Sequence, residues 1–525
     1  MARFGFIGGT YTSQSVTADA EECINLYPET VESQGGASAM TLYSTPGLKL
    51  FASVTGAHQH RGSSTINGRG FVVIDSTLYE VLANGMLTAL GNVGNDGAPC
   101  SFAAAPQQLA VVSAGALYVY QLVTQTNTGL GFNVTIPAGT FQQITGANAP
   151  WLPQAVTQVA YLDGFFFVLV ALSQTVYASN SFDATSWPPL SIKTINTFAD
   201  NVISMISDHR LLYLLGQKSS ETDYDAGSFP FPLVTLPSGT MEQGAAAQFA
   251  TAQIDNTVFF IGQRSDQGGG IAWRISGSNP VRISTHAVEL AWQSYQRSTK
   301  ISDAVAFVYQ DQGHTFWHVT FPSAQATWVY DVATNLWHRR GFFNLQRGAF
   351  QAALPISHMF LFGKHLVGDR ASGRLYDMEI PIQAGGGWAF CDDNGNPIRR
   401  VRTAGHIAQE HQWMRYSELE VYCETGLGPN PPLLDGQGEP RGPQVMLRCS
   451  RDGGHTWGSI RTESAGEAGK YLKRVSFRRL GRARDMVFEV SVTDPVPWRF
   501  VDAYVNPKSQ PSPRKRLVHQ YAEVG

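Results

Sequence analysis

Short apolar or alternating runs, separated by Gly, Asn, Asp and Ser, recur along most of the chain. In a typical unit, residues 70–75 precede residues 77–82, and Asn84-Gly85 forms the next turn. Asn-Gly favours a hairpin because both residues tolerate a positive φ. No convincing long amphipathic helix is found in the sequence. The pattern predicts an all-β protein.

Comparable pairs of runs return with a spacing of roughly 45–50 residues, which is the blade period of β-propellers. They lie at residues 70–82, 109–120, 159–179, 211–215, 257–275, 315–330 and 358–376. A four-stranded blade has two apolar faces that it cannot bury alone, and radial stacking buries them. We therefore predict a β-propeller of six or seven blades over residues 56–390. A string of β-sandwiches is the alternative.

A second, smaller domain is expected after the propeller. Residues 385–387 are all glycine and residues 392–397 are rich in Asp and Asn, which is typical of a junction. Alternating runs follow at 415–423, 444–449, 474–477 and 485–492, and they predict a β-sandwich-like domain over residues 391–506. Residues 1–55 are expected to form an N-terminal extended segment, and residues 507–525 a basic flexible tail.

Charge divides the chain in a similar way. Residues 1–394 carry 18 Lys and Arg against 27 Asp and Glu, a net charge of −9, whereas residues 395–525 carry 20 against 14, a net charge of +6. The two parts are therefore expected to face different neighbours. An acidic body argues against tight binding of duplex DNA over most of the surface.

Residues 97–162 contain no Asp, Glu, Lys or Arg. This stretch is either a neutral surface insertion or a contact surface, because neutral polar surface is cheaper to desolvate than charge. The five cysteines are far apart and form no CxxC pair, so no zinc site or disulfide framework is predicted. We expect no cofactor, no secretory leader and no membrane span.

The sharpest local motif is the Asp-box pattern S-x-D-x-G-x-T-W. Its residues are Ser450, Asp452, Gly454, Thr456 and Trp457. The carboxylate can accept backbone N–H bonds inside the turn, and Trp457 is expected to pack beneath the hairpin. The motif also occurs in sialidases. A glycosidase needs placed carboxylates, and no pair is singled out by spacing, so we interpret the box as a structural element of a protein that is not an enzyme.

Two histidine pairs, His58 with His60 and His314 with His318, are each expected on one face of a strand, without a carboxylate partner. We therefore predict no metal site. Basic residues gather near the C-terminus and form either a solvated face or a surface that contacts DNA or an acidic partner. They are Lys473, Arg474, Arg478, Arg479, Arg482, Arg484, Arg514, Lys515 and Arg516.

Several segments together resemble one known family. Residues 23–29 (CINLYPE) precede residues 42–48 (LYSTPGL), and residues 317–322, 327–331 and 336–338 add three aromatic-rich runs. The stretch from Leu447 through the Asp-box to Asp485 completes the set. In this order they are similar to the packaged-DNA stabilisation protein of short-tailed bacteriophages, also called the tail accessory factor, tail hub or nozzle.

This resemblance implies a structural part of the virion, assembled in the host cytoplasm as a ring of six copies below the portal. The ring would close the DNA channel after packaging and form part of the ejection conduit. The implied partners are the head–tail adaptor, tailspikes or fibres, a tail needle or plug, and double-stranded DNA that passes without sequence-specific binding. The alternatives are a carbohydrate-binding or sialidase-like propeller and a receptor-binding tail part.

Overall fold

The computed structural model describes residues 2–33, 35–129, 132–196, 200–264, 268–277, 279–384, 387–410, 412–429 and 431–509. The chain forms two compact units, and both are discontinuous in sequence. One consists of Met1–Ser44, Gly385–Gly387 and Arg399–Gly525, and the other of Thr45–Ala384 and Trp388–Ile398. No helix in the described residues is long and apolar enough to cross a bilayer.

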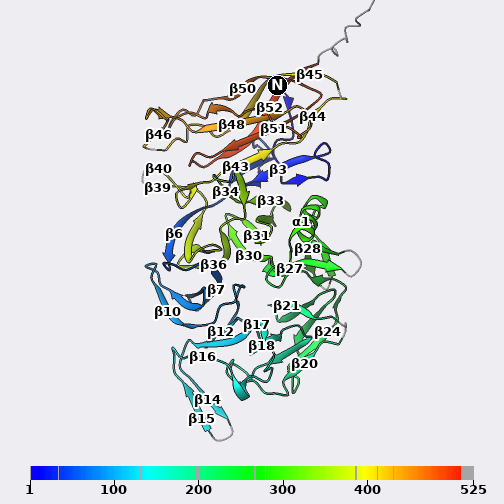
Figure 1. Ribbon diagram of the computed structural model, residues 1–525, viewed down its shortest axis with the longest axis vertical. Coiled ribbons are helices and arrows are strands. Elements are labelled where there is room, and N and C mark those ends of the chain that lie inside the picture. The colour runs from blue at the N-terminus through cyan, green and yellow to red at the C-terminus, as the bar shows by residue number, and fades with distance from the viewer. Residues whose placement is uncertain are drawn as a thin grey trace, which may run out of the picture. The chain divides into compact units, whose positions relative to one another are not determined.

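The second unit contains seven groups of antiparallel strands, of which the first four are separate four-stranded sheets (Figure 1). The first four consist of β7 (His60–Ile66), β8 (Arg69–Ile74), β9 (Thr77–Val81) and β10 (Leu87–Asn92); β11 (Ser101–Ala104), β12 (Gln108–Ser113), β13 (Ala116–Gln121) and β16 (Phe141–Gln143); β17 (Val156–Leu162), β18 (Phe165–Val170), β19 (Thr175–Ala178) and β20 (Ile192–Thr194); and β21 (Val202–Asp208), β22 (Leu211–Gly216), β23 (Ser220–Asp225) and β24 (Leu233–Met241).

The innermost strand of the fifth group is split between two short segments. The last three groups consist of β25 (Gly244–Ala245) with β26 (Ala252–Ile254), β27 (Thr257–Arg264), β28 (Gly268–Ser276) and β29 (Asn279–Arg282); β30 (Val305–Asp311), β31 (His314–Phe321), β32 (Ala326–Asp331) and β33 (Leu336–Arg340); and β36 (Pro355–Leu361), β37 (Lys364–Asp369), β38 (Arg374–Glu379) and β6 (Gly47–Ser53). We number these groups blades 1 to 7.

The blades form a closed ring. Their innermost strands are neighbours in the order β7, β11, β17, β21, β26, β30, β36 and again β7. The hydrophobic core lies between successive blades, because each apolar sheet face is covered by the next blade. Phe71 of blade 1 packs with Leu109 of blade 2, and Val72 of blade 1 packs with Leu366 of blade 7. The predicted β-propeller is confirmed, with seven blades in the structure.

Blade 7 is closed by a strand from the other end of the domain. β6 pairs antiparallel with β38, and Gly47 to Ser53 run opposite Glu379 to Arg374. The short strand β41 (Asp392–Asp393) pairs parallel with β6 on its other side. The propeller therefore holds its first and last blades together by backbone hydrogen bonds instead of leaving two free edges.

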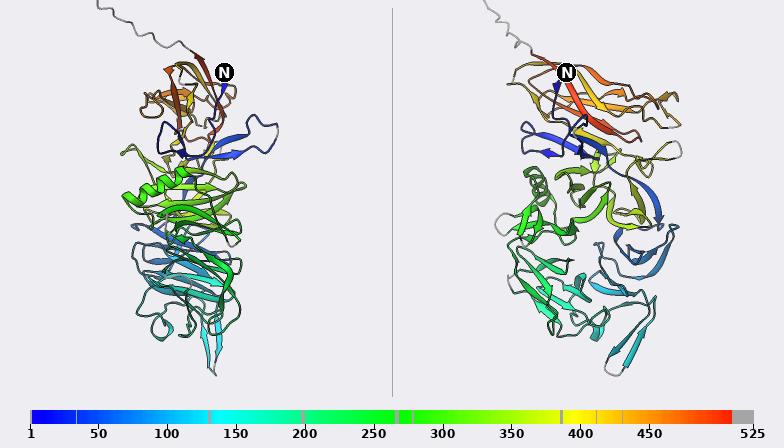
Figure 2. Two further views of the ribbon diagram at one scale, coloured as in Figure 1. Left: turned by 90° about the vertical axis from the view of Figure 1, so that its right-hand side faces the viewer. Right: turned by 180° about the vertical axis from the view of Figure 1, so that it is seen from behind.

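Two features of the propeller were not expected. The helix α1 (His286–Ser298) follows blade 5, with Thr285 as its N-cap and Val288 and Trp292 buried one turn apart. The sequence analysis expected no long amphipathic helix and did not identify this one of 13 residues. In blade 2, the hairpin of β14 (Gln125–Gly129) and β15 (Phe132–Ile136) forms a separate two-stranded sheet that projects from the propeller (Figure 2).

The first unit is a sandwich of two sheets. One has the strand order β4 (Leu26–Thr30), β5 (Met40–Ser44), β52 (Arg499–Ser509), β45 (Met414–Cys423) and β50 (Val475–Ala483). The other has the order β3 (Ala20–Ile24), β43 (Arg400–Thr403), β51 (Asp485–Val492), β48 (Gln444–Ser450) and β49 (Arg461–Ser464). Tyr416 of the first sheet and Phe488 of the second are both buried, with ring centroids 6.3 Å apart.

The N-terminal residues are part of this sandwich. Arg402, fully buried on β43, donates hydrogen bonds to the carbonyl oxygens of Phe6 and Gly9 at 2.5 and 2.8 Å and pairs with Glu21. The separate extended segment predicted over residues 1–55 is therefore divided between the sandwich and blade 7. The sandwich resumes at Arg399 and not at residue 391, and β52 continues to Ser509.

Candidate interaction site on the β-sandwich

The turn after β48 is held by its own polar side chains. The Asp452 carboxylate accepts hydrogen bonds from the Ser450 hydroxyl at 2.7 Å and from the backbone N–H and hydroxyl of Thr456 at 2.9 and 2.6 Å. Gly453 and Gly454 both have a positive φ, 68° and 94°. The Thr456 hydroxyl, followed by the Thr456 N–H and the Ser450 hydroxyl, lowers the pKa of Asp452 to about 2.

Trp457 ends this turn and lies half-buried beside β48. The guanidinium of Arg448 is 5.2 Å from the centre of the indole ring, within the range of a cation–π contact. Arg448 in turn pairs with Glu489 through two hydrogen bonds of 2.9 and 2.5 Å. The five residues of the predicted Asp-box therefore form one ordered turn, with Trp457 held against Arg448.

The structure divides the predicted basic cluster. Arg474 pairs with Glu420, with 2.7 Å between Nε and Oε1, and Arg478 lies 3.3 Å from Glu418. Both glutamates are on β45, the strand that pairs with β50. The guanidiniums of Arg482 and Arg484 lie 5.2 and 5.3 Å from the ring of Trp413.

The remaining members of the cluster have no acidic partner in the described structure or lie beyond it. Lys473 and Arg479 are exposed, and neither forms a salt bridge within the described residues. The predicted residues Arg514, Lys515 and Arg516 lie outside the described residues. Two arginines of the predicted basic cluster are thus neutralised by glutamates of β45.

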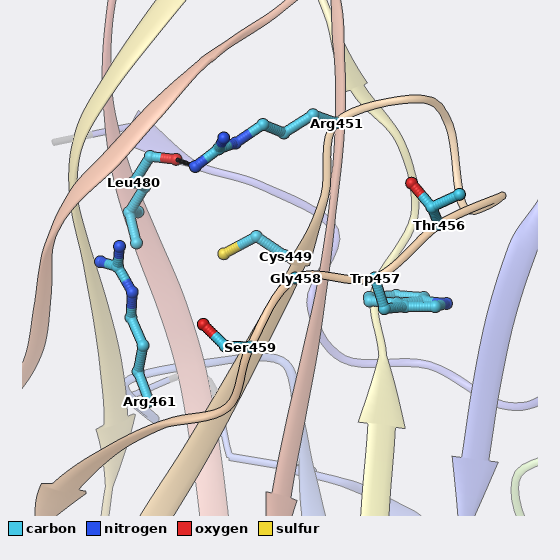
Figure 3. Close-up of a pocket in the computed structure, with 8 residues that line it drawn as sticks. All are labelled: Cys449, Arg451, Thr456, Trp457, Gly458, Ser459, Arg461 and Leu480. Atoms are coloured by element: carbon cyan, nitrogen blue, oxygen red, sulfur yellow. Dashed lines mark hydrogen bonds between the residues drawn. The ribbon is translucent and has the colours of Figure 1, made fainter.

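A pocket of about 330 Å³ lies between this turn and β50 (Figure 3). Its lining consists of Cys449, Arg451, Thr456, Trp457, Gly458, Ser459, Arg461 and Leu480, without a carboxylate among these described residues. The Cys449 thiol and the Ser459 hydroxyl point into the space between the two guanidiniums. Sequence reasoning identified Thr456 and Trp457 but missed both pocket arginines.

The two pocket arginines are anchored by an irregularity in β50. The pairing of β45 with β50 shifts between Tyr416 and Glu418, so that Arg479 and Leu480 oppose a single residue, and Arg479 has a positive φ of 59°. Arg461 donates to the carbonyl oxygens of Arg478 and Arg479 at 2.7 and 3.3 Å. Arg451 donates to the carbonyl oxygen of Leu480 at 3.1 Å. Such a β-bulge leaves carbonyl groups without strand partners, and the arginines bind them.

The predicted histidine pairs do not form shared sites. His58 is exposed and bonds to Asp75, whereas His60 is buried and lies 3.1 Å from the Ser357 hydroxyl. His314 bonds to Asp331 at 2.8 Å, and His318 stacks on Phe307. The expectation that neither pair has a carboxylate partner was therefore wrong for His58 and His314. No cluster of three metal-ligating side chains is found within the described residues.

Two family models match the chain in succession. Residues 3–382 match the β-propeller of bacteriophage P22 Gp10, and residues 399–507 match the β-sandwich of the same protein. The chain belongs to the P22 Gp10 family. As a Gp10 family member it is a structural phage tail accessory protein that takes part in stabilising packaged DNA, and it is a component of the virion tail.

Solved structures that match this Gp10 family member have low sequence identity and low TM-scores. The extracellular domain of a hybrid two-component system, BT4673, of B. thetaiotaomicron is 7% identical, with a TM-score of 0.40, over 65% of this chain and 40% of that one. The chain therefore spans less than half of that relative. The computationally designed Ika8 protein is 12% identical, with a TM-score of 0.34, over 63% of this chain and all of that one. No curated protein matches the sequence.

Proposed function

We propose that this protein is a ring-forming tail hub subunit that closes the portal channel, retains the packaged DNA and forms part of the conduit for its ejection. The observation that carries this proposal is the match of both Gp10 domains, in order, over nearly the whole chain. The expected ring holds six copies. Its expected neighbours are the head–tail adaptor, tailspikes or fibres, and a tail needle or plug.

The net charges of the two units support a conduit through which DNA slides without being bound by the protein surface. Counted over the two units of the structure, the propeller unit carries 17 Lys and Arg against 22 Asp and Glu, a net charge of −5. The sandwich unit carries 21 against 19, a net charge of +2. Duplex DNA is bound mainly through its phosphates, so a mildly acidic surface lets it slide without sequence-specific contacts.

The uncharged stretch 97–162 supports a role for blade 2 in subunit contacts. It covers all four strands of blade 2 and the β14–β15 hairpin. Because no charge has to be desolvated there, this blade is suited to a contact between copies. We propose that the Asp-box turn is structural and that the protein is not an enzyme. Assembly in the host cytoplasm is part of the same proposal.

Native mass spectrometry of the purified full chain, with and without the candidate adaptor, tests the ring. We expect a six-fold species, either alone or once the adaptor is added, since a ring held by neutral surface contacts assembles by mass action. A chain that remains monomeric with the adaptor and binds glycans would contradict the hub and favour a carbohydrate-binding propeller.

A further inference from the structure

The two arginines of the β-sandwich pocket are oriented before any partner arrives. Three carbonyl oxygens of the β50 bulge accept their hydrogen bonds, at 2.7, 3.3 and 3.1 Å. A guanidinium has five N–H donors in a fixed plane, so these bonds leave several donors on each arginine for another ligand. A preorganised side chain loses little conformational entropy on binding.

No carboxylate pairs with either of these two arginines within the described residues. Elsewhere in the sandwich the unit neutralises its own arginines, since Arg441 pairs with Asp494 and Arg448 with Glu489. Arg451 and Arg461 have only carbonyl partners within the described residues, and both are exposed. Both also lie close enough to Cys449 to oppose the rise in the pKa of its thiol, which burial nevertheless raises to about 11. Positive charge is therefore concentrated around Cys449 in this pocket.

The size and walls of the pocket select among anions. Its volume of about 330 Å³ accommodates a side chain and not a DNA duplex. Leu480 provides apolar wall, and Ser459 adds a hydroxyl (Figure 3). Arginine is one of the residue types enriched in interface hot spots. A carboxylate can accept paired N–H bonds from a guanidinium fork.

We propose that this pocket receives a carboxylate side chain from an acidic segment of a neighbouring tail protein, held between the guanidiniums of Arg451 and Arg461. The inference rests on the proposed function in one respect, because it requires the chain to sit among other tail proteins. It concerns the pocket alone, and the exposed arginines of β50 are a separate candidate contact.

The rate at which Cys449 is labelled can report whether the pocket is occupied. Cys449 is half-exposed in the pocket, whereas Cys23, Cys100, Cys391 and Cys423 are buried. Because the raised pKa of Cys449 leaves little thiolate at pH 8.5, a thiol reagent should label the free chain slowly, but at Cys449 before the four buried cysteines. In assembled tails we expect the rate of labelling at Cys449 to fall at least tenfold. Tails that assemble but keep Cys449 as reactive as in the free chain would overturn the inference while leaving the hub intact.

Substitutions test whether the positive charge of the pocket arginines binds the neighbour, or whether the neighbour only covers the pocket. The double variant Arg451→Gln and Arg461→Gln should reduce incorporation into tails, and the tails that form should regain labelling at Cys449. The matched control, Arg474→Gln with Arg478→Gln, removes two arginines that glutamates already neutralise, and it should behave like the unchanged chain. Normal incorporation and protection in the pocket variant would contradict a bound carboxylate.

The same labelling distinguishes a protein carboxylate from a DNA phosphate. Tails joined to heads that hold no DNA should protect Cys449 as well as tails on filled heads do. Protection that appears only with packaged DNA would overturn the acidic protein segment and assign the pocket to phosphate.

Discussion

Single residues in this protein take their properties from where the fold places them. His58 and His60 are two positions apart, yet one is exposed and the other is buried against blade 7, where a Cβ on Gly368 would meet its ring. Burial lowers the pKa of His60 to about 3. Burial likewise lowers the pKa of His318, His338 and His358, so blades 1, 6 and 7 contain histidines that stay neutral when folded.

The buried histidines predict loss of propeller stability in acid. The pKa of His60 is lower in the folded than in the unfolded chain, where it is near 6.5. The unfolded chain thus binds the proton first, and stability falls as the pH drops below about 6.5. Each such histidine contributes a slope of about 1.4 kcal/mol per pH unit.

His60→Gln tests this slope. Urea unfolding between pH 7.5 and 4.5 should show a pH dependence that is shallower by about 1.4 kcal/mol per pH unit than that of the unchanged chain. His58→Gln, two positions away, is the matched control and should retain most of the slope. Equal slopes in the His60 variant and the unchanged chain would refute the role of His60.

Pocket residues show what sequence can and cannot reveal at this scale. Thr456 and Trp457 were found because the Asp-box is a local pattern of neighbouring residues. Arg451 and Arg461 were missed because their partners are carbonyl groups of a bulge in β50, and no local pattern in the sequence indicates which strand lies beside them. Glu418 and Glu420, which neutralise two predicted basic residues, were missed for the same reason.

Elements were predictable where their signal is local. The paired runs of the sequence correspond to strands of all seven blades because both faces of a blade are covered, so its central strands, such as β12 and β18, are buried runs separated by polar turns. The helix α1 was missed because its buried stripe is short, with Val288 and Trp292 one turn apart. Strand β6 was not assigned to blade 7, since pairing between residue 48 and residue 378 leaves no trace in either segment alone.

The closing strand β6 carries a prediction of its own. Leu48 is buried in blade 7, whereas Leu50 on the same strand is 48% exposed. Leu48→Ala removes buried apolar surface and should lower the free energy of unfolding of the propeller by about 2–5 kcal/mol. Leu50→Ala should change it by only about 0.5 kcal/mol. Tryptophan fluorescence in urea measures both, and equal effects would argue against β6 as a structural part of the blade.

At the scale of the whole molecule, assembly is the property to test. Of the exposed arginines on and beside β50, Arg478 and Arg474 are neutralised, so a second acidic contact, separate from the pocket, would use Arg479, Arg482 and Arg484. Replacing these three by Gln should reduce incorporation into tails about tenfold, since three contacts of about 0.5 kcal/mol each combine to that factor.

The double variant Arg474→Gln with Arg478→Gln is again the control and should assemble normally. Quantitative mass spectrometry of purified particles provides the measurement. If the triple variant is incorporated at the level of the unchanged chain, the arginines of β50 do not dock a neighbour, and only the pocket arginines would remain as a basic contact of this domain.

The late pairing of β6 also sets the order of events on the ribosome. Residues 47–53 emerge early, but their partners on β38 are made more than 300 residues later, which at bacterial elongation rates is a delay of roughly 15–65 seconds. During that delay the first six blades can form, while β6 has an unpaired edge that can recruit a strand from another nascent chain. A chaperone that shields residues 47–53 during synthesis would therefore raise the yield of closed propellers.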